Sequence, residues 1–241
     1  MSVSSEEELR KFVAPEMVFG LGARKLAGKY ARNFAGKKVM VVTDPGIIAA
    51  GWLQDVTACL EEEGLPFVVY SGVTPNTRAD EVVEGAAVYD REGCDIIIAV
   101  GGGSIIDCAK GIGIVSANKE HILAFKGVDR VPVPMPPLIC VSTTSGSSAD
   151  VSQFAVITDM ENRVKIAIVS KALVPDVALV DPQTLTTMDS YLTACTGFDA
   201  LAHAVEAFVS NASPPITDLH SLEAVRLITQ NLLPAVRDPQ N

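Results

Sequence analysis

The sequence predicts an α/β protein with a parallel β-sheet, followed by the beginning of an all-helical region. Short apolar runs rich in Val and Ile alternate with helix-length amphipathic stretches over most of the chain, which is the pattern of βαβ units. A glycine-rich turn joins one of these runs to a helix. Beyond residue 187 the strand pattern stops and two apolar helices are expected. Right-handed βαβ connections place helices on both faces of such a sheet.

The elements before the glycine-rich turn follow one another regularly. Strands are expected at 39–44, 67–70 and 95–100, an edge strand or arm within 12–22, and helices at 24–33, 47–63, 78–92 and 105–115. The carboxyl ends of parallel strands meet at one edge of the sheet, where ligands bind in this class of fold. Asp44, Asn76 and the turn at Gly101–Ser104 are therefore expected to lie together.

The pattern changes past Asn118, where the proline-rich stretch 131–137 predicts an extended connector. The later elements are expected to be strands at 138–142 and 175–182, a hairpin of 151–158 with 164–169, and helices at 191–210 and 216–232. The boundary near 187 divides the chain into a Rossmann-like domain, 1–187, and the start of an all-helical domain, 188–241. That second part is shorter than most independent domains.

Composition excludes several classes of function. The 241 residues are 48% hydrophobic and carry a net charge of −10, so the chain has no basic field for nucleic acid or an anionic membrane surface. No apolar run approaches the roughly 20 residues of a membrane span, and the polar stretch 1–10 does not resemble a signal peptide. Five scattered cysteines without CxxC pairs, four of them in apolar segments, are expected to be buried free thiols of a cytoplasmic protein.

The turn Gly101–Ser104 is the first candidate site. Its three glycines allow positive φ and close approach of a ligand, and the helix that follows directs N–H groups and the positive end of its dipole at an anion such as pyrophosphate. Ser104 and Asp107 have the spacing of a capping box, which predicts the start of that helix. The residues alone leave two interpretations open, a phosphate site or an ordinary tight turn.

Two further patterns suggest chemistry. The segment 143–150, Thr-Thr-Ser-Gly-Ser-Ser-Ala-Asp, offers hydroxyl and N–H donors to a phosphate or a nicotinamide amide, or is a solvated loop. Asp199 and His203 are four residues apart on an expected helix, so they share one face, and both suit a divalent metal. An ordinary Asp–His pair is the alternative. His121 and His220 are interpreted as solvated helix-surface residues.

The three motifs together, in this order and spacing, resemble the iron-containing (group III) alcohol dehydrogenases. The resemblance implies an NAD-binding α/β domain, an all-helical domain and a divalent metal in the cleft between them, Fe²⁺ or alternatively Zn²⁺ or Mn²⁺. Asp199 and His203 would be metal ligands. The implied cofactor residues are Asp44 at the adenosine ribose, Gly102, Gly103 and Ser104 at the pyrophosphate, Thr143, Thr144 and Ser147 at the nicotinamide, and Asn76, Lys165 and Leu179 on the remaining ribose and ring surfaces.

The implied activity is hydride transfer between a small primary alcohol or aldehyde and NAD, with the metal as Lewis acid. Asp44 is the position where the resemblance implies a preference for NAD over NADP. Ser145, Ser148 and Asp150 depart mildly from the family pattern. Two further histidine ligands of the family would fall beyond residue 241, so the resemblance implies that the chain is a fragment of a longer enzyme. The alternatives are a non-catalytic NAD-binding chain, or a relative of glycerol dehydrogenase or dehydroquinate synthase. A homo-oligomer, dimer or larger, is implied, and the helices after 187 are expected to expose apolar surface.

Overall fold

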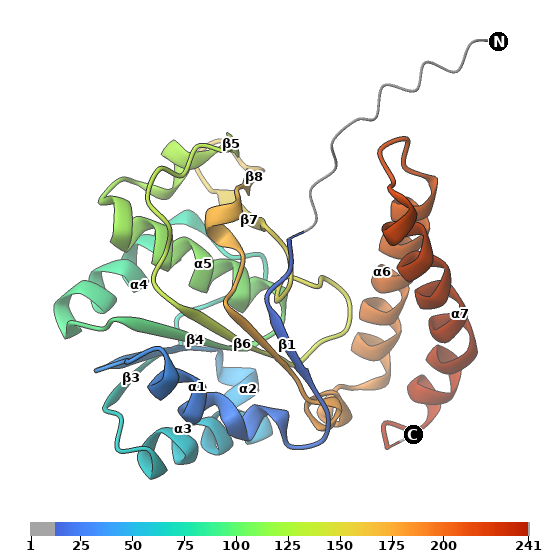
Figure 1. Ribbon diagram of the computed structural model, residues 1–241, viewed down its shortest axis with the longest axis horizontal. Helices are drawn as coiled ribbons and strands as arrows, with labels where there is room; N and C mark the ends of the chain where they lie inside the picture. Colours follow the sequence, from blue (N-terminus) through green and yellow to red (C-terminus); the bar gives the residue numbers. More distant parts are fainter. Residues whose placement is uncertain (1–12, 241) are drawn as a thin grey trace.

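The computed structural model describes residues 13–240, and it contains two sheets and a helical hairpin (Figure 1). The predicted polar stretch 1–10 lies outside the described residues. The large sheet is parallel throughout and has the order β1-β9-β6-β4-β2-β3. Its strands are β1 (Glu16–Phe19), β2 (Val39–Val42), β3 (Phe67–Tyr70), β4 (Ile96–Gly101), β6 (Leu138–Ser142) and β9 (Val177–Val180). The predicted parallel α/β architecture is confirmed.

Helices connect and cover these strands. They are α1 (Ala27–Asn33), α2 (Pro45–Ala50), α3 (Trp52–Glu62), α4 (Ala79–Glu92) and α5 (Gly103–Asn118), with α6 (Ser190–Val209) and α7 (Pro215–Arg237) after the sheet. Short 3₁₀ helices are η1 (Ala23–Leu26), η2 (Ile122–Phe125), η3 (Lys171–Leu173) and η4 (Pro182–Thr187). The single helix predicted for 47–63 is two helices, because Gly51 takes the left-handed conformation (φ 89°) between α2 and α3.

Both faces of the large sheet are buried. Alternate residues of a strand point to opposite faces, so Met40 and Val42 join the core under α4 and α5, while Val39 and Val41 join the core under α1 and α3. All four side chains are fully buried. This explains why the strand sequences are continuously apolar, as expected for a sheet covered on both sides.

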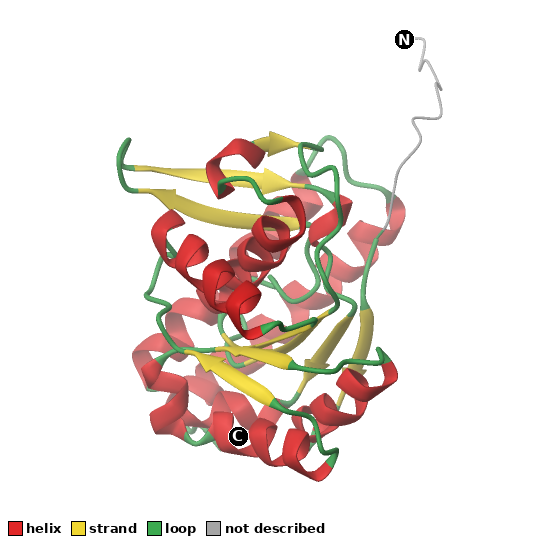
Figure 2. Cartoon of the chain, turned by 90° about the vertical axis from the view of Figure 1, so that its left-hand side faces the viewer, coloured by secondary structure: helices red, strands yellow, loops and turns green. Residues whose placement is uncertain are grey.

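A second, three-stranded sheet lies beyond α5 (Figure 2). It contains β5 (Gly127–Val128), β7 (Phe154–Asp159) and β8 (Val164–Val169) in the order β5-β8-β7. β7 and β8 form the predicted antiparallel hairpin, with Ile157 opposite Ile166. β7 is the edge strand that faces α5, so the helix lies between the two sheets.

The chain order places a topological switch between β2 and β4. After β2 the chain moves outward to β3, whereas after β4 it moves to the opposite side through β6 and β9. The loops that leave the carboxyl ends of β2 and β4 therefore diverge, and a crevice opens between them. Asp44 and Gly102 stand at the two sides of that point.

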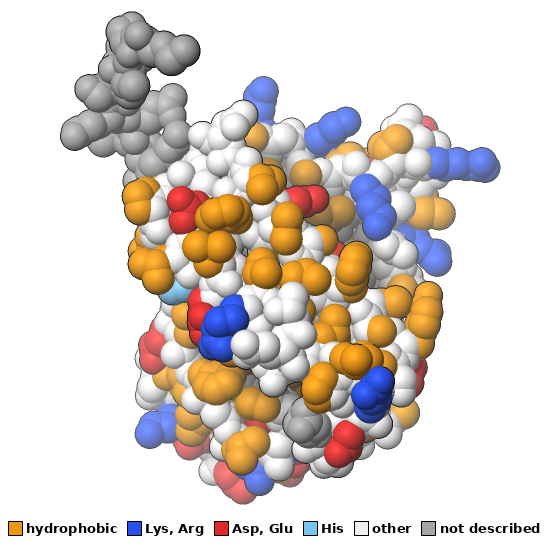
Figure 3. All heavy atoms as spheres, turned by 90° about the vertical axis from the view of Figure 1, so that its right-hand side faces the viewer, with side chains coloured by type: hydrophobic (Ala, Val, Ile, Leu, Met, Phe, Trp, Pro, Cys, Tyr) orange, Lys and Arg blue, Asp and Glu red, His pale blue; other side chains and the backbone are white. Residues whose placement is uncertain are grey.

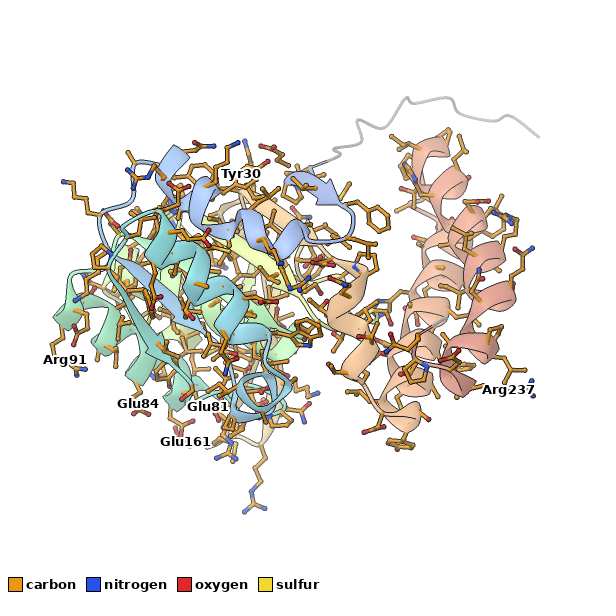
Figure 4. The ribbon with its side chains drawn as sticks, turned by 90° about the horizontal axis from the view of Figure 1, so that it is seen from below. Tyr30, Glu81, Glu84, Arg91, Glu161 and Arg237 are labelled. Atoms are coloured by element: carbon orange, nitrogen blue, oxygen red, sulfur yellow. The ribbon has the colours of Figure 1, made fainter. Side chains whose placement is uncertain are left out.

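The hairpin α6–α7 stands to one side of the α/β part, with α6 nearer to it (Figures 1 and 4). The two helices pack closely at Gly197, where an added Cβ would lie 2.2 Å from Leu232 Cδ1. Many apolar side chains on the pair are exposed, as expected, and they are visible on the helical face in Figure 3. They include Tyr191, Leu192, Phe198, Val205, Phe208, Val209, Ile216, Leu219, Leu222, Leu227 and Leu233. Between residues 13 and 240, no helix combines the length and apolar character needed to cross a membrane.

Candidate nucleotide and metal site

A cavity of about 660 Å³ lies at the carboxyl edge of the large sheet, beside the switch point. The loops after β2, β4 and β6 line it, together with the β7–β8 hairpin and the first half of α6. Nine of the ten predicted cofactor residues line this cavity: Asp44, Asn76, Gly102, Gly103, Ser104, Thr143, Thr144, Ser147 and Lys165. Segments distant in sequence thus converge where the parallel fold is expected to bind a ligand.

The glycine turn leaves the start of α5 open towards this cavity. α5 begins at Gly103 with Gly102 as its N-cap, and no side chain caps it in the described part of the chain. The predicted capping box of Ser104 and Asp107 is therefore wrong, because Ser104 already lies inside the first turn. Ser104 Oγ instead accepts the N–H of Asn76 at 3.1 Å. The first N–H groups of an uncapped helix are suited to an anion.

Close packing explains why Gly102 and Gly103 carry no side chain. A Cβ on Gly102 would lie 3.0 Å from the Thr144 side chain, and one on Gly103 would lie 2.5 Å from Ser147 Oγ. The turn and the hydroxyl-rich loop thus form one narrow cradle. Thr143 Oγ1 is buried at this cradle without a hydrogen-bond partner among residues 13–240. Such an unpaired buried hydroxyl is available to a ligand.

The β7–β8 hairpin places Lys165 next to Asn76. Lys165 Nζ donates to Asn76 Oδ1 at 2.7 Å, and Thr158 Oγ1 donates to the Asn76 carbonyl at 2.9 Å. Asn76 itself has a positive φ of 61°, a conformation that Asn tolerates better than most residues. These bonds place a cation and two amide or hydroxyl groups at the same wall of the cavity. Thr158 was not among the predicted site residues, because its only signal in the sequence was its place in the β7–β8 hairpin.

The other two predicted nucleotide contacts have different surroundings. Asp44 is half-buried at the cavity and caps α2 by accepting the N–H of Ile47 at 2.8 Å. Leu179 is fully buried in the core under α1 and α3, and it is not among the residues that line the cavity. The alternation of β9 directs Leu179 to that apolar face. The structure therefore does not bring the Leu179 side chain to the site.

Asp199 and His203 share one face of α6, as predicted. His203 Nε2 lies 3.6 Å from Asp199 Oδ1, and each side chain is about half exposed. Asp199 lines the cavity, whereas His203 does not. A carboxylate and an imidazole are suitable donors for a divalent metal. Within residues 13–240, however, no group of three or more His, Cys, Asp or Glu side chains comes together, so the pair supplies only part of a ligand set.

The remaining histidines and cysteines show no comparable arrangement. His121 is exposed and precedes η2, where its Nδ1 accepts the N–H of Leu123 at 3.3 Å. It is thus a cap and not the helix-surface residue that was expected. His220 is exposed on α7, in agreement with the prediction. All five cysteines are free, as predicted, and four of them are buried. The predicted burial is wrong for Cys195, which is exposed on α6.

A second cavity of about 750 Å³ lies between η4 and the helical hairpin. Apolar residues such as Leu185, Leu227 and Leu232 dominate its wall, and Thr144 is the predicted site residue that reaches it. It adjoins the first cavity at Thr144 and Met188. Its wall offers little that would hold a charged cofactor.

The fold defines an α/β protein with a Rossmann-like parallel sheet followed by helices. Residues 14–182 match the family described as iron-containing alcohol dehydrogenase, and residues 193–241 match the C-terminal region of the Fe-containing alcohol dehydrogenase family. The chain belongs to the iron-containing alcohol dehydrogenase family. Both predictions, of fold and of family, are confirmed.

Individual relatives agree with this assignment. Alcohol dehydrogenase 4 of Schizosaccharomyces pombe is 40% identical over 91% of this chain and 52% of its own length. NAD-dependent methanol dehydrogenase of Bacillus methanolicus is 35% identical over 95% of this chain and 60% of its own length. A crystal structure of 1,3-propanediol oxidoreductase superposes with a TM-score of 0.95 at 38% identity, covering 97% of this chain and 62% of that one. The chain thus spans less than two thirds of these relatives.

Proposed function

We propose that the protein is an NAD-dependent, metal-dependent dehydrogenase of small primary alcohols, in which residues 1–187 form the nucleotide-binding domain and 188–241 begin the metal-binding domain. The observation that carries the proposal is the cradle at Gly102, Gly103 and Ser147, open to a helix N-terminus and lined by the unpaired Thr143 hydroxyl. Pyrophosphate fits that donor set. The family of the chain supports the same conclusion.

Each part of the cavity has a role in this proposal. The start of α5 binds the pyrophosphate, and Thr143, Thr144 and Ser147 hold the nicotinamide side. Asp44 accepts from the adenosine ribose hydroxyls and repels a 2′-phosphate, which selects NAD. Lys165 and Asn76 hold the nicotinamide ribose. Bound NAD would accept or deliver the hydride, while these side chains orient it.

Asp199 and His203 would hold a divalent metal, Fe²⁺ first, at the edge of the cavity. When bound, such a metal would supply Lewis-acid chemistry to the alcohol oxygen. The two side chains fit this role in chemical type and spacing. The remaining ligands would have to come from outside the described residues, since residues 13–240 bring no third one to the pair.

That incomplete ligand set favours a second candidate function for this chain, namely a nucleotide-binding module without catalytic activity. The test is anaerobic loading with Fe²⁺, metal analysis, and NAD⁺ reduction with methanol, ethanol and 1,3-propanediol. Stoichiometric metal that is lost in Asp199→Asn and His203→Ala, together with turnover, supports the dehydrogenase. Nucleotide binding without metal or turnover supports the second candidate. A folded chain that binds no nucleotide contradicts both.

A further inference from the structure

Lys110 is a fully buried lysine on α5 whose role the proposed function does not explain. Its side chain is 0% exposed, and its ammonium donates to the carbonyls of Ser152 and Phe154, both at 2.8 Å, and to Ser152 Oγ at 3.3 Å. An ammonium has three donors, so Lys110 is fully satisfied. All three acceptors lie in one short segment at the start of β7.

Asp107, one helical turn before Lys110, contacts the same strand. Its carboxylate accepts the N–H of Val156 at 3.1 Å. Residues three apart on a helix lie on the same side, so Lys110 and Asp107 face β7 together. The cation holds carbonyl groups, and the carboxylate holds an N–H group.

These contacts fall on the open edge of β7. The backbone of Gln153 bonds to the β8 side, where the Gln153 carbonyl accepts the N–H of Ser170 at 3.0 Å. The even-numbered residues 152, 154, 156 and 158 point their backbone groups the other way, towards α5. The last of them, Thr158, donates its N–H to the Thr77 carbonyl at 2.8 Å. The edge of the small sheet is therefore closed by α5 and by the segment next to Asn76, as an exposed edge requires.

Charge balance supports this arrangement. Burial lowers the pKa of Lys110, while the carboxylates of Asp107 and Asp150 nearby act in the opposite direction. An apolar side chain of similar length at position 110 would fill the same space without the cost of desolvating a charge. The buried ammonium, with three acceptors and two carboxylates nearby, therefore indicates a specific structural role.

We propose that Lys110 and Asp107 are positioning residues of the nucleotide site: they hold the open edge of β7 on α5 and thereby place Thr158 and Lys165 beside the glycine turn. The inference rests on the proposed function, because the position of the β7–β8 hairpin matters for binding only if the cavity holds a nucleotide. α5 carries the glycine turn at its start and the two anchors in its next turns, so one helix fixes both walls of the cavity.

The test compares Lys110→Met with Lys119→Met, a matched control at the end of α5 where the lysine is exposed and pairs with Asp90 at 2.6 Å. Hydrogen exchange of the free chain should show lost protection across residues 152–158 in Lys110→Met only. Affinity for NADH should fall at least about tenfold, which is about 1.4 kcal/mol. Affinity for 5′-AMP should change less than about twofold, because the part of the cavity proposed to bind adenosine is formed by the loop after β2, which carries Asp44, and not by the β7–β8 hairpin.

The outcomes are distinguishable. Equal losses of NADH and AMP affinity would mean a general structural role and would overturn the proposal, as would lost protection with unchanged NADH affinity. Failure of the wild-type chain to bind NADH would instead contradict the proposed function, while the exchange experiment would still report on the anchors.

A second pair of variants keeps the proposal testable if Lys110→Met does not fold. Asp107→Asn retains an oxygen that can accept the Val156 N–H, whereas Asp107→Leu has a similar size and no acceptor. Asp107→Asn should keep protection at Val156 and a ratio of NADH to AMP affinity closer to that of the wild type than Asp107→Leu does. Identical behaviour of the two variants would overturn the proposal.

Discussion

Gly146, in the hydroxyl-rich loop, packs directly against Asp199 on α6. A Cβ at Gly146 would lie 2.8 Å from Asp199 Oδ2 and 2.9 Å from the Thr196 carbonyl. The loop that lines the candidate nucleotide cavity and the helix that carries the two candidate metal ligands are thus in van der Waals contact through a glycine. This contact sets how close the two parts of the candidate site can come.

Gly146→Ala is expected to push α6 away from the loop, because the backbone carbonyl of Thr196 cannot yield as a side chain would. Overpacking of this kind costs about 1–3 kcal/mol. Urea denaturation should show this loss. Ser145→Ala, next to it in the loop, should cost less, at most about 1 kcal/mol, because it removes only the exposed hydrogen bond between Ser145 Oγ and Thr196 Oγ1 at 3.2 Å. An alanine variant as stable as the wild type would show that α6 is free to move.

Asp44 caps α2, and in the proposed function it also selects NAD over NADP; substitution can separate these two roles. Asp44→Ser removes the charge but keeps a side chain able to cap α2, whereas Asp44→Ala removes both and should also cost about 1 kcal/mol of stability. Both variants should gain affinity for NADP⁺ relative to NAD⁺, measured by calorimetric titration. An unchanged ratio in both would exclude Asp44 as the selecting group.

Arg24 holds η1, α3 and η4 together and should be essential for stability. It is 6% exposed, and it donates to Asp55 at 2.7 Å, to Gln183 at 2.9 Å and to the buried carboxylate of Asp181. Its guanidinium also lies 4.8 Å from the ring centroid of Trp52.

Arg24→Met would leave Asp181 as an unpaired buried charge, so we expect a loss of about 3–5 kcal/mol in the free energy of unfolding. Arg226→Met is the control, because Arg226 pairs with Glu223 on the exposed surface of α7, and we expect no measurable change there. Similar losses in both variants would argue against a special role for the Arg24 network.

Asp107 should make stability depend on pH. Burial raises the pKa of Asp107 to about 6 from an ordinary value of 3.8, although Lys110 and the Val156 N–H oppose the shift. The folded state therefore binds a proton in the pH range where the unfolded chain has released it. The contribution of Asp107 to stability is full below pH 3.8 and is lost as pH rises through 6.

The comparison of wild type with Asp107→Asn isolates this effect. Between pH 4 and pH 7.5 the wild type should lose about 1–2 kcal/mol relative to the variant, less than the full shift implies because the Asp107 side chain keeps some contact with solvent. Chemical denaturation across this range measures it. Parallel pH profiles of the two proteins would contradict the assigned pKa.

Much of the fold could be predicted because strand and helix patterns are local. The apolar runs of β3, β6 and β8 gave their strand limits directly. The break at Gly51 was harder to predict, because the left-handed conformation of Gly51 splits a helix whose apolar spacing continues on both sides. The start of α5 was misplaced for a related reason: the same residue types serve as helix caps and as tertiary partners, and Ser104 is the latter.

The candidate site was partly predictable from the sequence. The motifs and the resemblance together identified ten residues of the cavity wall, nine predicted cofactor residues and Asp199. Leu179 was carried over by resemblance, and the alternation of β9 places it in the core. Lys110 lay in a helical pattern that could not reveal its burial, because its acceptors are more than forty residues away in the chain. Contacts of that kind depend on the packing of α5 against β7, which no local pattern encodes.

The most direct test of the account is calorimetric titration of the chain with NADH and with NADPH, without added metal. We expect one NADH per chain, and NADPH weaker by at least about tenfold, because in the proposed function the Asp44 carboxylate would repel the 2′-phosphate of NADPH. A folded chain that binds neither nucleotide would contradict the assignment of the cavity at Gly102–Ser104.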